Sequence, residues 1–444
     1  LFRSGINTYM SQSKREIIKE EVVSETTYRS LGLKDDLMRA LTALGVNILT
    51  PIQAKVIPRA IAGESVVARG KNGTGKTFSY LVPILQSIDL KNPNLQAIIV
   101  VPVRELALQI SGIIKDFTRY MIGLRHTYVI GGCSQEDNIQ TVQVLREGVQ
   151  IVVGTPGKLS TIAKESYIRV SDVKFFVFDE ADKLLEVDET RDIDIARQAI
   201  GISRIIPKTA QILLLSATFN RECIVGIKEV MGDRSYSQQN AMSCMVPQGL
   251  THYYVYKKSG DKIKILRTLL TKLRIDHCMI FCNSVRSSRN LLYIAVKKLG
   301  FPALAVHSHM TQTERNKAFD KFKKGEARYL ICSDLYQRGI DVPSVNIVIN
   351  FDFPFDIATY LHRAGRASRF GRRGVVISLL QSSDEEKFFE TQKALSIDIS
   401  PFPKEIPKSV FMAAGLSVSS EGDEEAVEGP EHPRHSTSGE ERKE

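Results

Sequence analysis

The chain has 444 residues but no tryptophan, and only 7% of its residues are aromatic. Broad base-stacking platforms are therefore not expected, and a polyanion would be held mainly through its phosphates. The six cysteines include no Cys-x-x-Cys pair, which suggests a reducing compartment and no structural zinc. No apolar run is long enough to span a membrane and the N-terminus has no signal-peptide core, so we expect a cytoplasmic protein without membrane attachment.

The charge is unevenly distributed along the chain. The net charge is +10, yet residues 412–444 contain nine acidic and three basic residues, which leaves +16 on the rest. A basic body fits a polyanionic partner. The acidic end, rich in Ser, Gly, Glu and Pro, has the composition of a disordered tail that either aids solubility or competes with the polyanion for the basic body.

A glycine-rich loop follows a β-branched run at 66–68. It has the form Gly70-x4-Gly75-Lys76-Thr77 and opens an apolar, helix-like segment. Such a loop turns backbone N–H groups toward phosphates, while the lysine reaches the β and γ phosphates and the threonine binds Mg²⁺. A glycine turn between two buried elements is the alternative. The expected ATP-binding residues here are Gly73, Thr74, Gly75, Lys76 and Thr77.

Three carboxylates follow an apolar run at 175–178, where a parallel sheet places its chemistry. Asp179 comes first after the run and is expected to hold Mg²⁺, together with Thr77 and partly through water. Glu180 is expected to orient and deprotonate the attacking water, and Asp182 to couple neighbouring motifs. The alternative is a solvated loop of helix-capping acids, but the phosphate loop favours catalysis.

Apolar runs alternate with amphipathic segments, which predicts an α/β fold with parallel sheets. The pattern occurs twice, so we expect two domains on a flexible hinge. Only the first has a phosphate loop, and the second is therefore either regulatory or completes the active site. The strand-like runs are 97–101, 151–153, 175–178 and 212–215, then 279–282, 304–306, 329–332, 347–349 and 375–379. The expected divisions are an extension at 1–24, a first domain at 25–235, a linker at 236–249, a second domain at 250–411 and the tail at 412–444.

With Asp179-Glu180-Ala181-Asp182 as its acidic box, the chain resembles the DEAD-box ATP-dependent RNA helicases over roughly residues 28–405. Other matching motifs occur in the family's order, which makes the resemblance specific. They include Thr50-Pro51-Ile52-Gln53, Pro102-Val103-Arg104-Glu105, Gly131-Gly132, Thr155-Pro156-Gly157-Lys158, Ser216-Ala217-Thr218, Gln312-Thr313-Glu314-Arg315, Arg338-Gly339-Ile340-Asp341 and His362-Arg363-Ala364-Gly365-Arg366-Ala367-Ser368-Arg369.

The resemblance implies tandem RecA-like domains that close when ATP and single-stranded RNA are both bound, with hydrolysis reopening them. It implies that Gln53, Tyr28 and Asp341 bind ATP, that Arg366 and Arg369 are catalytic arginine fingers, and that Asp182, Ser216, Thr218 and His362 couple hydrolysis to closure. A surface arginine cluster is the alternative to the fingers. The implied RNA-binding residues are Arg104, Gly131, Gly132, Thr155, Gly157, Arg315, Gly339 and Arg363.

Three stretches are most similar to the subfamily that activates decapping and represses translation in mRNA granules (P bodies), namely Lys71-Asn72-Gly73-Thr74-Gly75-Lys76, Asp182-Lys183-Leu184-Leu185 and Asn350-Phe351-Asp352-Phe353-Pro354. That similarity implies partners from decapping and translational repression that bind the second domain. A largely non-catalytic, ATP-gated RNA clamp is the alternative function. The chain departs from the family at Val46, where an aromatic residue usually stacks on adenine, and at Lys158, which replaces an arginine.

Overall fold

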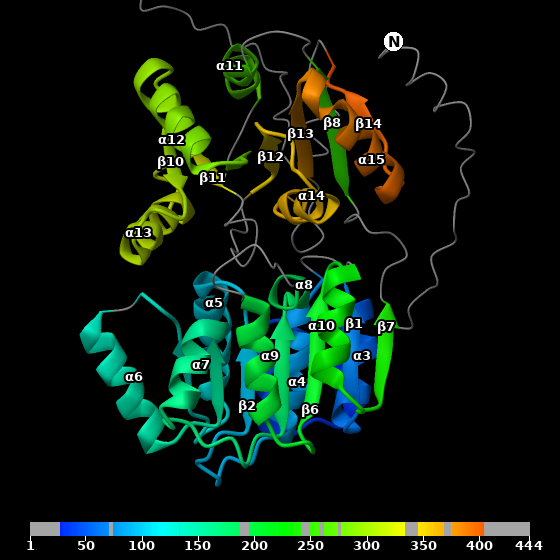
Figure 1. Cartoon of the computed structure of the whole chain (residues 1–444), viewed down its shortest axis with the longest axis vertical. Helices are drawn as coiled ribbons and strands as arrows, with labels where there is room; N and C mark the ends of the chain where they lie inside the picture. The colour runs from blue at the N-terminus through cyan, green and yellow to red at the C-terminus, as the bar shows by residue number, and fades with distance from the viewer. Residues whose placement is uncertain are drawn as a thin grey trace, which may run out of the picture.

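The structure is a computed structural model that describes residues 27–70, 74–132, 134–186, 195–219, 221–240, 249–256, 262–273, 277–333, 345–367 and 374–403. They form two α/β domains, one above the other in Figure 1. Each is built on a seven-stranded sheet, and every pairing between neighbouring strands is parallel. The expected α/β architecture is confirmed.

The first domain has the strand order β3-β4-β2-β5-β6-β1-β7. Its strands are β1 (Ser65–Arg69), β2 (Ala97–Val100), β3 (His126–Val129), β4 (Ile151–Gly154), β5 (Phe175–Asp179), β6 (Gln211–Ser216) and β7 (Tyr236–Asn240). A 3-10 turn at Tyr28–Leu31 precedes the helices α2 (Asp35–Ala43), α3 (Pro51–Ile61), α4 (Lys76–Ser87), α5 (Arg104–Thr118), α6 (Gln135–Glu147), α7 (Pro156–Lys164), α8 (Ala181–Leu184), α9 (Ile195–Ile205) and α10 (Arg221–Met231).

The second domain has the order β10-β11-β9-β12-β13-β8-β14. Its strands are β8 (Leu250–Tyr256), β9 (Cys278–Cys282), β10 (Ala303–Val306), β11 (Tyr329–Ser333), β12 (Ile347–Asn350), β13 (Gly374–Leu380) and β14 (Ile399–Pro401). The helices are α11 (Lys262–Lys272), α12 (Val285–Tyr293), which continues as a π-helical turn (Ile294–Lys298), α13 (Gln312–Lys323), α14 (Ile357–Ala364) and, after a 3-10 turn (Ser382–Asp384), α15 (Glu385–Leu395).

The central strands of each sheet are buried on both faces. Along β2, Ile99 contributes to one core cluster and Ile98 and Val100 to another, and the second domain has two equivalent clusters. This burial on both faces explains why the sequences of these strands are continuous apolar runs. All nine predicted runs lie in strands to within one residue.

The edge strand β7 differs from the prediction. We assigned its residues, Tyr236–Asn240, to the linker because they are polar, but they pair in parallel with β1 from Ser65 to Arg69. An edge strand keeps one side in solvent, so its composition resembles that of a loop. The rest of the expected linker, from 241 to 248, lies outside the described residues, as do the extension at 1–24 and the tail at 412–444.

The order of the first sheet divides its carboxyl edge into two halves. Strands β5, β6 and β1 are neighbours, so the acidic box, Ser216 and the phosphate loop converge on one half. Strands β3, β4 and β2 form the other half, where Gly131, Thr155 and Arg104 follow the strand ends. The topology alone therefore separates the expected ATP and RNA residues.

Helix α14 follows β12 and lies on the side of the second domain that faces the first (Figure 1). Asp356 caps it, because Asp356 Oδ1 accepts a hydrogen bond from Thr359 N–H at 2.7 Å. On its buried face, Tyr360 Oη lies 2.8 Å from His252 Nδ1 of β8, and the two rings stack with centroids 5.8 Å apart. This buried pair anchors the helix on the sheet.

Burial lowers the pKa of His252 from 6.5 to about 4. The folded protein therefore keeps this imidazole neutral at pH values where the unfolded chain protonates it, so the free energy of unfolding falls as the pH drops below 6.5. Between pH 7 and 4.5 we expect His252→Phe to lose about 2 kcal/mol less of this free energy than the wild type. Denaturant unfolding followed by circular dichroism measures the difference.

The exposed Ile122 provides the control, because Ile122→Phe removes no titratable group and should follow the wild type across this pH range. An unchanged fall in the free energy of unfolding for His252→Phe would show that His252 does not stay neutral in the folded state.

Candidate active site and nucleic-acid interface

The phosphate loop is braced by Gln53 of α3. Gln53 Nε2 donates a hydrogen bond to Gly75 O at 3.1 Å, while Gln53 Oε1 accepts from Thr50 N–H in a capping box. Gly75 caps α4 with a φ of 83°, and a Cβ added there would lie 2.3 Å from Gln53 Nε2. Only glycine fits both constraints. Thr74 is half-buried beside it, and Gly73 lies outside the described residues.

Lys76 is buried at the start of α4. Its Nζ donates to Gly70 O at 2.9 Å, so the ammonium group is held across the mouth of the loop. Burial lowers the pKa of Lys76 from 10.5 to about 8, Asp179, Glu180 and Asp182 act against that shift, and Arg366 adds to it. The three acids and an arginine of the second domain therefore lie within electrostatic reach of this lysine.

Asp179 ends β5 and both of its carboxylate oxygens accept hydrogen bonds. Oδ1 accepts from Glu180 N–H at 2.9 Å, and Oδ2 accepts from the Tyr80 hydroxyl at 2.9 Å. Burial raises the pKa of Asp179, and Lys76 opposes that rise. Sequence reasoning missed Tyr80. Its signal was its position three residues after Thr77, which puts both side chains on the same face of α4.

Glu180 turns the chain directly from β5 into α8. Its φ of 54° and ψ of 48° are left-handed, a conformation that costs a non-glycine residue about 1 kcal/mol or more. The sharp turn keeps Asp179, Glu180 and Asp182 together at the strand end, where all three are buried.

The oxygen atoms at this site suit Mg²⁺ and a triphosphate. The Thr77 hydroxyl and the Asp179 carboxylate are hard oxygen donors beside a lysine and a helix N-terminus. Within the described ranges, no cluster of three or more His, Cys, Asp or Glu could hold a metal ion. Mg²⁺ needs no such cluster, because it commonly takes one or two carboxylates and completes its shell with phosphates and water.

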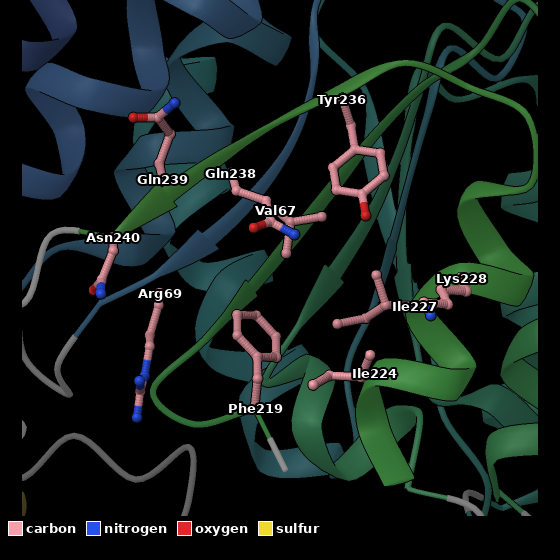
Figure 2. Close-up of a pocket in the computed structure, with 10 residues that line it drawn as sticks. All are labelled: Val67, Arg69, Phe219, Ile224, Ile227, Lys228, Tyr236, Gln238, Gln239 and Asn240. Carbon is pink, nitrogen blue, oxygen red and sulfur yellow. The ribbon is translucent and has the colours of Figure 1, made fainter. Parts of the chain in front are cut away.

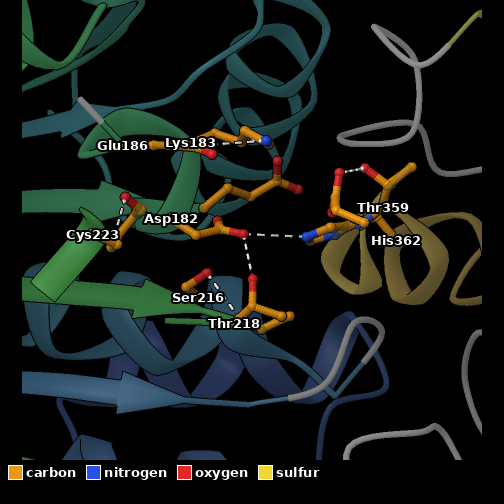
Figure 3. A network of polar contacts seen from close by, with 12 residues as sticks. Asp182, Lys183, Glu186, Ser216, Thr218, Cys223, Thr359 and His362 are labelled. Atoms are coloured by element: carbon orange, nitrogen blue, oxygen red, sulfur yellow. Dashed lines mark hydrogen bonds and ion pairs between the residues drawn. The ribbon is translucent and has the colours of Figure 1, made fainter. Parts of the chain in front are cut away.

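Asp182 joins the two domains (Figure 3). Asp182 Oδ2 accepts a hydrogen bond from Thr218 Oγ1 at 2.6 Å and lies 3.2 Å from His362 Nε2 of α14, which therefore carries a proton. Thr218 N–H donates to Ser216 Oγ at 3.3 Å. The four residues expected to couple the domains thus form one connected network.

Arg366 lies one turn after His362. Its Nε donates to His362 O at 3.2 Å, and the side chain is only 3% exposed. Together with its effect on the pKa of Lys76, this places Arg366 toward the ATP half of the sheet edge. Arg369 and Asp341 lie outside the described residues.

The expected RNA residues of the first domain gather on the other half of that edge. Arg104 begins α5, and its guanidinium lies over Gly132, where an added Cβ would be 2.3 Å from Arg104 Nη1. Gly132 has a φ of 71°, a left-handed backbone conformation that favours glycine. Thr155 N–H donates to Val129 O at 3.1 Å, and the exposed Gly157 follows in the first turn of α7.

Arg315 and Glu105 form a second contact between the domains. Arg315 Nη1 lies 3.5 Å from Glu105 Oε1, and Arg315 Nη2 donates to Ser308 O at 2.8 Å. Both side chains are about nine-tenths buried. Arg315, which we expected to bind RNA, therefore lies at the domain junction, and its charge is paired with a carboxylate that sequence reasoning did not single out.

Arg363 differs from the prediction. It is 0% exposed and donates from Nη1 to Asp352 O at 2.7 Å and from Nη2 to Asn283 Oδ1 at 2.7 Å, with its guanidinium 5.4 Å from the centre of the Phe281 ring. Every one of these partners belongs to the second domain. In this arrangement the Arg363 guanidinium is buried inside the second domain and links β9 to the segment after β12. Gly339 lies outside the described residues.

Tyr28 also departs from the prediction. Its side chain is 1% exposed in the core cluster that contains Leu33 and Leu37, so protein covers the ring that we expected to contact ATP. The adjacent Thr27 bridges to Ile48, which ties this segment to the loop before Gln53.

A cavity of 410 Å³ lies beside the edge strand β7 (Figure 2). It is lined by Val67, Arg69, Phe219, Ile224, Ile227, Lys228, Tyr236, Gln238, Gln239 and Asn240. None of these is an expected ATP or RNA residue, so the hollow is separate from the candidate site.

The family model for DEAD/DEAH box helicases matches residues 50–224, and the one for the helicase conserved C-terminal domain matches 261–371. The chain is 38% identical to ATP-dependent RNA helicase DHH1 of Kluyveromyces lactis over 394 residues, which is 88% of this chain and 74% of that protein. It is also 38% identical to DEAD-box ATP-dependent RNA helicase 6 of Arabidopsis thaliana, over 85% of this chain and 69% of the relative.

Solved structures are similar across both domains. S. cerevisiae Dbp5 bound to RNA and ADP BeF3 has a TM-score of 0.78 and 26% identity, over 88% of this chain and 98% of that one. Mss116p bound to single-stranded RNA and AMP-PNP has a TM-score of 0.76 and 26% identity, over 90% and 84%. The chain belongs to the family of DEAD-box ATP-dependent RNA helicases, and its two sheets are tandem RecA-like domains.

No helix in the described part of the chain is long and apolar enough to cross a membrane.

Proposed function

We propose that this protein is an RNA-dependent ATPase whose two domains close on ATP and single-stranded RNA together and separate short duplexes locally. The contact from His362 to Asp182 carries the proposal, because it ties the helix that bears Arg366 to the acidic box of the other domain. The RNA-bound relatives Dbp5 and Mss116p support the same two-domain arrangement.

In the proposed ATP site each residue has a distinct task. Lys76 and the backbone at Gly75 bind the phosphates, and Thr77 and Asp179 hold Mg²⁺, which would offset phosphate charge. Glu180 orients and deprotonates water, while Arg366 and Arg369 stabilise charge that develops on the γ phosphate. Gln53 positions the loop, and Asp341 serves the ribose.

The proposed RNA track crosses the other half of the sheet edge. Arg104, Gly131, Gly132, Thr155 and Gly157 would grip phosphates and sugars in the first domain, and Arg315 and Gly339 would continue the track in the second. Contacts to sugar hydroxyls favour RNA over DNA without reading bases. A strand bent by closure no longer fits a duplex, so short duplexes would separate with little translocation.

We further propose a role in cytoplasmic mRNA decay and translational repression, in P bodies, with decapping and repression proteins bound to the second domain. The support is the similarity to DHH1 helicases from several fungi, at 36 to 38% identity. A clamp that binds RNA in an ATP-gated way with little turnover is the second candidate, and it uses the same sites.

The first test is ATP hydrolysis by the purified protein with and without single-stranded RNA. We expect RNA to stimulate hydrolysis, and Glu180→Gln to reduce the stimulated rate by about 100-fold or more, since it removes the base. Arg366→Ala should abolish hydrolysis comparably while nucleotide binding remains.

The exposed Arg328 of the same domain is the matched control, and Arg328→Ala should turn over normally. Absence of hydrolysis in the wild type, with ATP-dependent RNA binding intact, would support the clamp. Normal ATP turnover by Arg366→Ala would contradict the role of Arg366 as an arginine finger.

The cellular proposal is tested by tethering the protein to a reporter mRNA. We expect lower translation and faster decapping of that message than of an untethered reporter. A tethered Glu180→Gln variant separates the roles, since a scaffold would still repress. Unchanged translation and decay with the wild type would contradict the proposed pathway.

A further inference from the structure

Tyr80 is a buried polar group inside an apolar helix. It lies in the middle of α4, is 0% exposed, and its ring belongs to the core cluster of the first domain. Phenylalanine would fill this space equally well, so packing alone does not require the hydroxyl. A buried hydroxyl without a partner is costly, and this one has two.

The two partners of Tyr80 come from separate elements. Its hydroxyl donates to Asp179 Oδ2 at 2.9 Å, at the end of β5. The Thr77 side chain, one turn earlier on α4, acts on the same phenol as a hydrogen-bond donor, which opposes the rise that burial causes in the pKa of Tyr80. Because the phenol proton goes to the carboxylate, a Thr77 hydroxyl that bonds to Tyr80 Oη does so by donating its own proton.

Tyr80 thus connects the two residues assigned to Mg²⁺ under the proposed function, on which this inference rests. A Thr77 hydroxyl that donates to Tyr80 keeps its lone pairs for a cation. Asp179 receives one bond on each oxygen, from Tyr80 and from Glu180 N–H, which fixes the carboxylate plane and leaves further lone pairs available.

We propose that Tyr80 is a positioning residue for Mg²⁺, which orients the Thr77 hydroxyl and the Asp179 carboxylate through one shared phenol. Tyr80 is 0% exposed, so it would act only through these two side chains. Residues that orient metal ligands in this way typically change metal affinity about 10- to 100-fold when they are removed. Tyr80→Phe would leave Asp179 Oδ2 without its donor and Thr77 free to rotate, while the ring stays packed.

Equilibrium binding of a fluorescent ADP analogue, with Mg²⁺ titrated against EDTA, tests this without relying on turnover. We expect Mg²⁺ to tighten binding of the analogue to the wild type. In Tyr80→Phe the Mg²⁺ concentration for half of that tightening should rise about 10-fold or more, while affinity in EDTA stays within about twofold.

Two variants serve as controls. Tyr329→Phe removes another buried tyrosine hydroxyl, in β11 of the second domain, and should behave as the wild type. Asp179→Asn should lose the Mg²⁺-dependent tightening. Tyr80→Met provides a second hydroxyl-free variant if Tyr80→Phe does not fold.

An unchanged Mg²⁺ dependence in Tyr80→Phe would overturn the inference and leave the proposed ATPase standing. Equal weakening in EDTA and in Mg²⁺ would also overturn it, since the defect would then lie in the loop. If Mg²⁺ had no effect on the wild type, the proposed function itself would fail.

Discussion

The structure depends on one carboxylate, that of Asp182, which is shared between the two domains. A single oxygen accepts from Thr218 in the first domain and from His362 in the second. The group is 4% exposed, so water competes poorly for these bonds. Since Asp182 is two residues from Glu180 and His362 one turn from Arg366, the network connects the position of the second domain to the residues proposed to carry out hydrolysis.

The strand order of the first sheet places the two sets of proposed ligand-binding residues on separate halves of its carboxyl edge. Strands β5, β6 and β1 bring the residues proposed to bind ATP to one half of the sheet edge, and β3, β4 and β2 bring those proposed to bind RNA to the other. Each half has its own contact with the second domain, Asp182 with His362 on one side and Glu105 with Arg315 on the other. Two contacts at separate points fix the rotation of one domain against the other, and they make ligands on either half sensitive to closure.

The sequence predicted what depends on local chemistry, and it failed where tertiary context decides. Strands such as β5 and β12 are buried on both faces and therefore appear in the sequence as continuous apolar runs. The phosphate loop and the acidic box are recognised from the residue types and their spacing. Arg363 could not be separated from Arg366, since both lie in one motif and only packing shows that Arg363 is enclosed by Asn283 and Asp352. The hydrogen bond from Tyr80 to Asp179 and the pairing of β7 with β1 also join segments that are far apart in the sequence.

The most direct test of the central claim is the linkage between the two ligands. RNA affinity is measured with and without a non-hydrolysable ATP analogue, for the wild type and for His362→Ala. If closure through Asp182 joins the sites, the analogue tightens RNA binding by the wild type, RNA tightens analogue binding by the same factor, and His362→Ala loses most of both effects while binding each ligand alone as before. Undiminished tightening in His362→Ala would contradict the account.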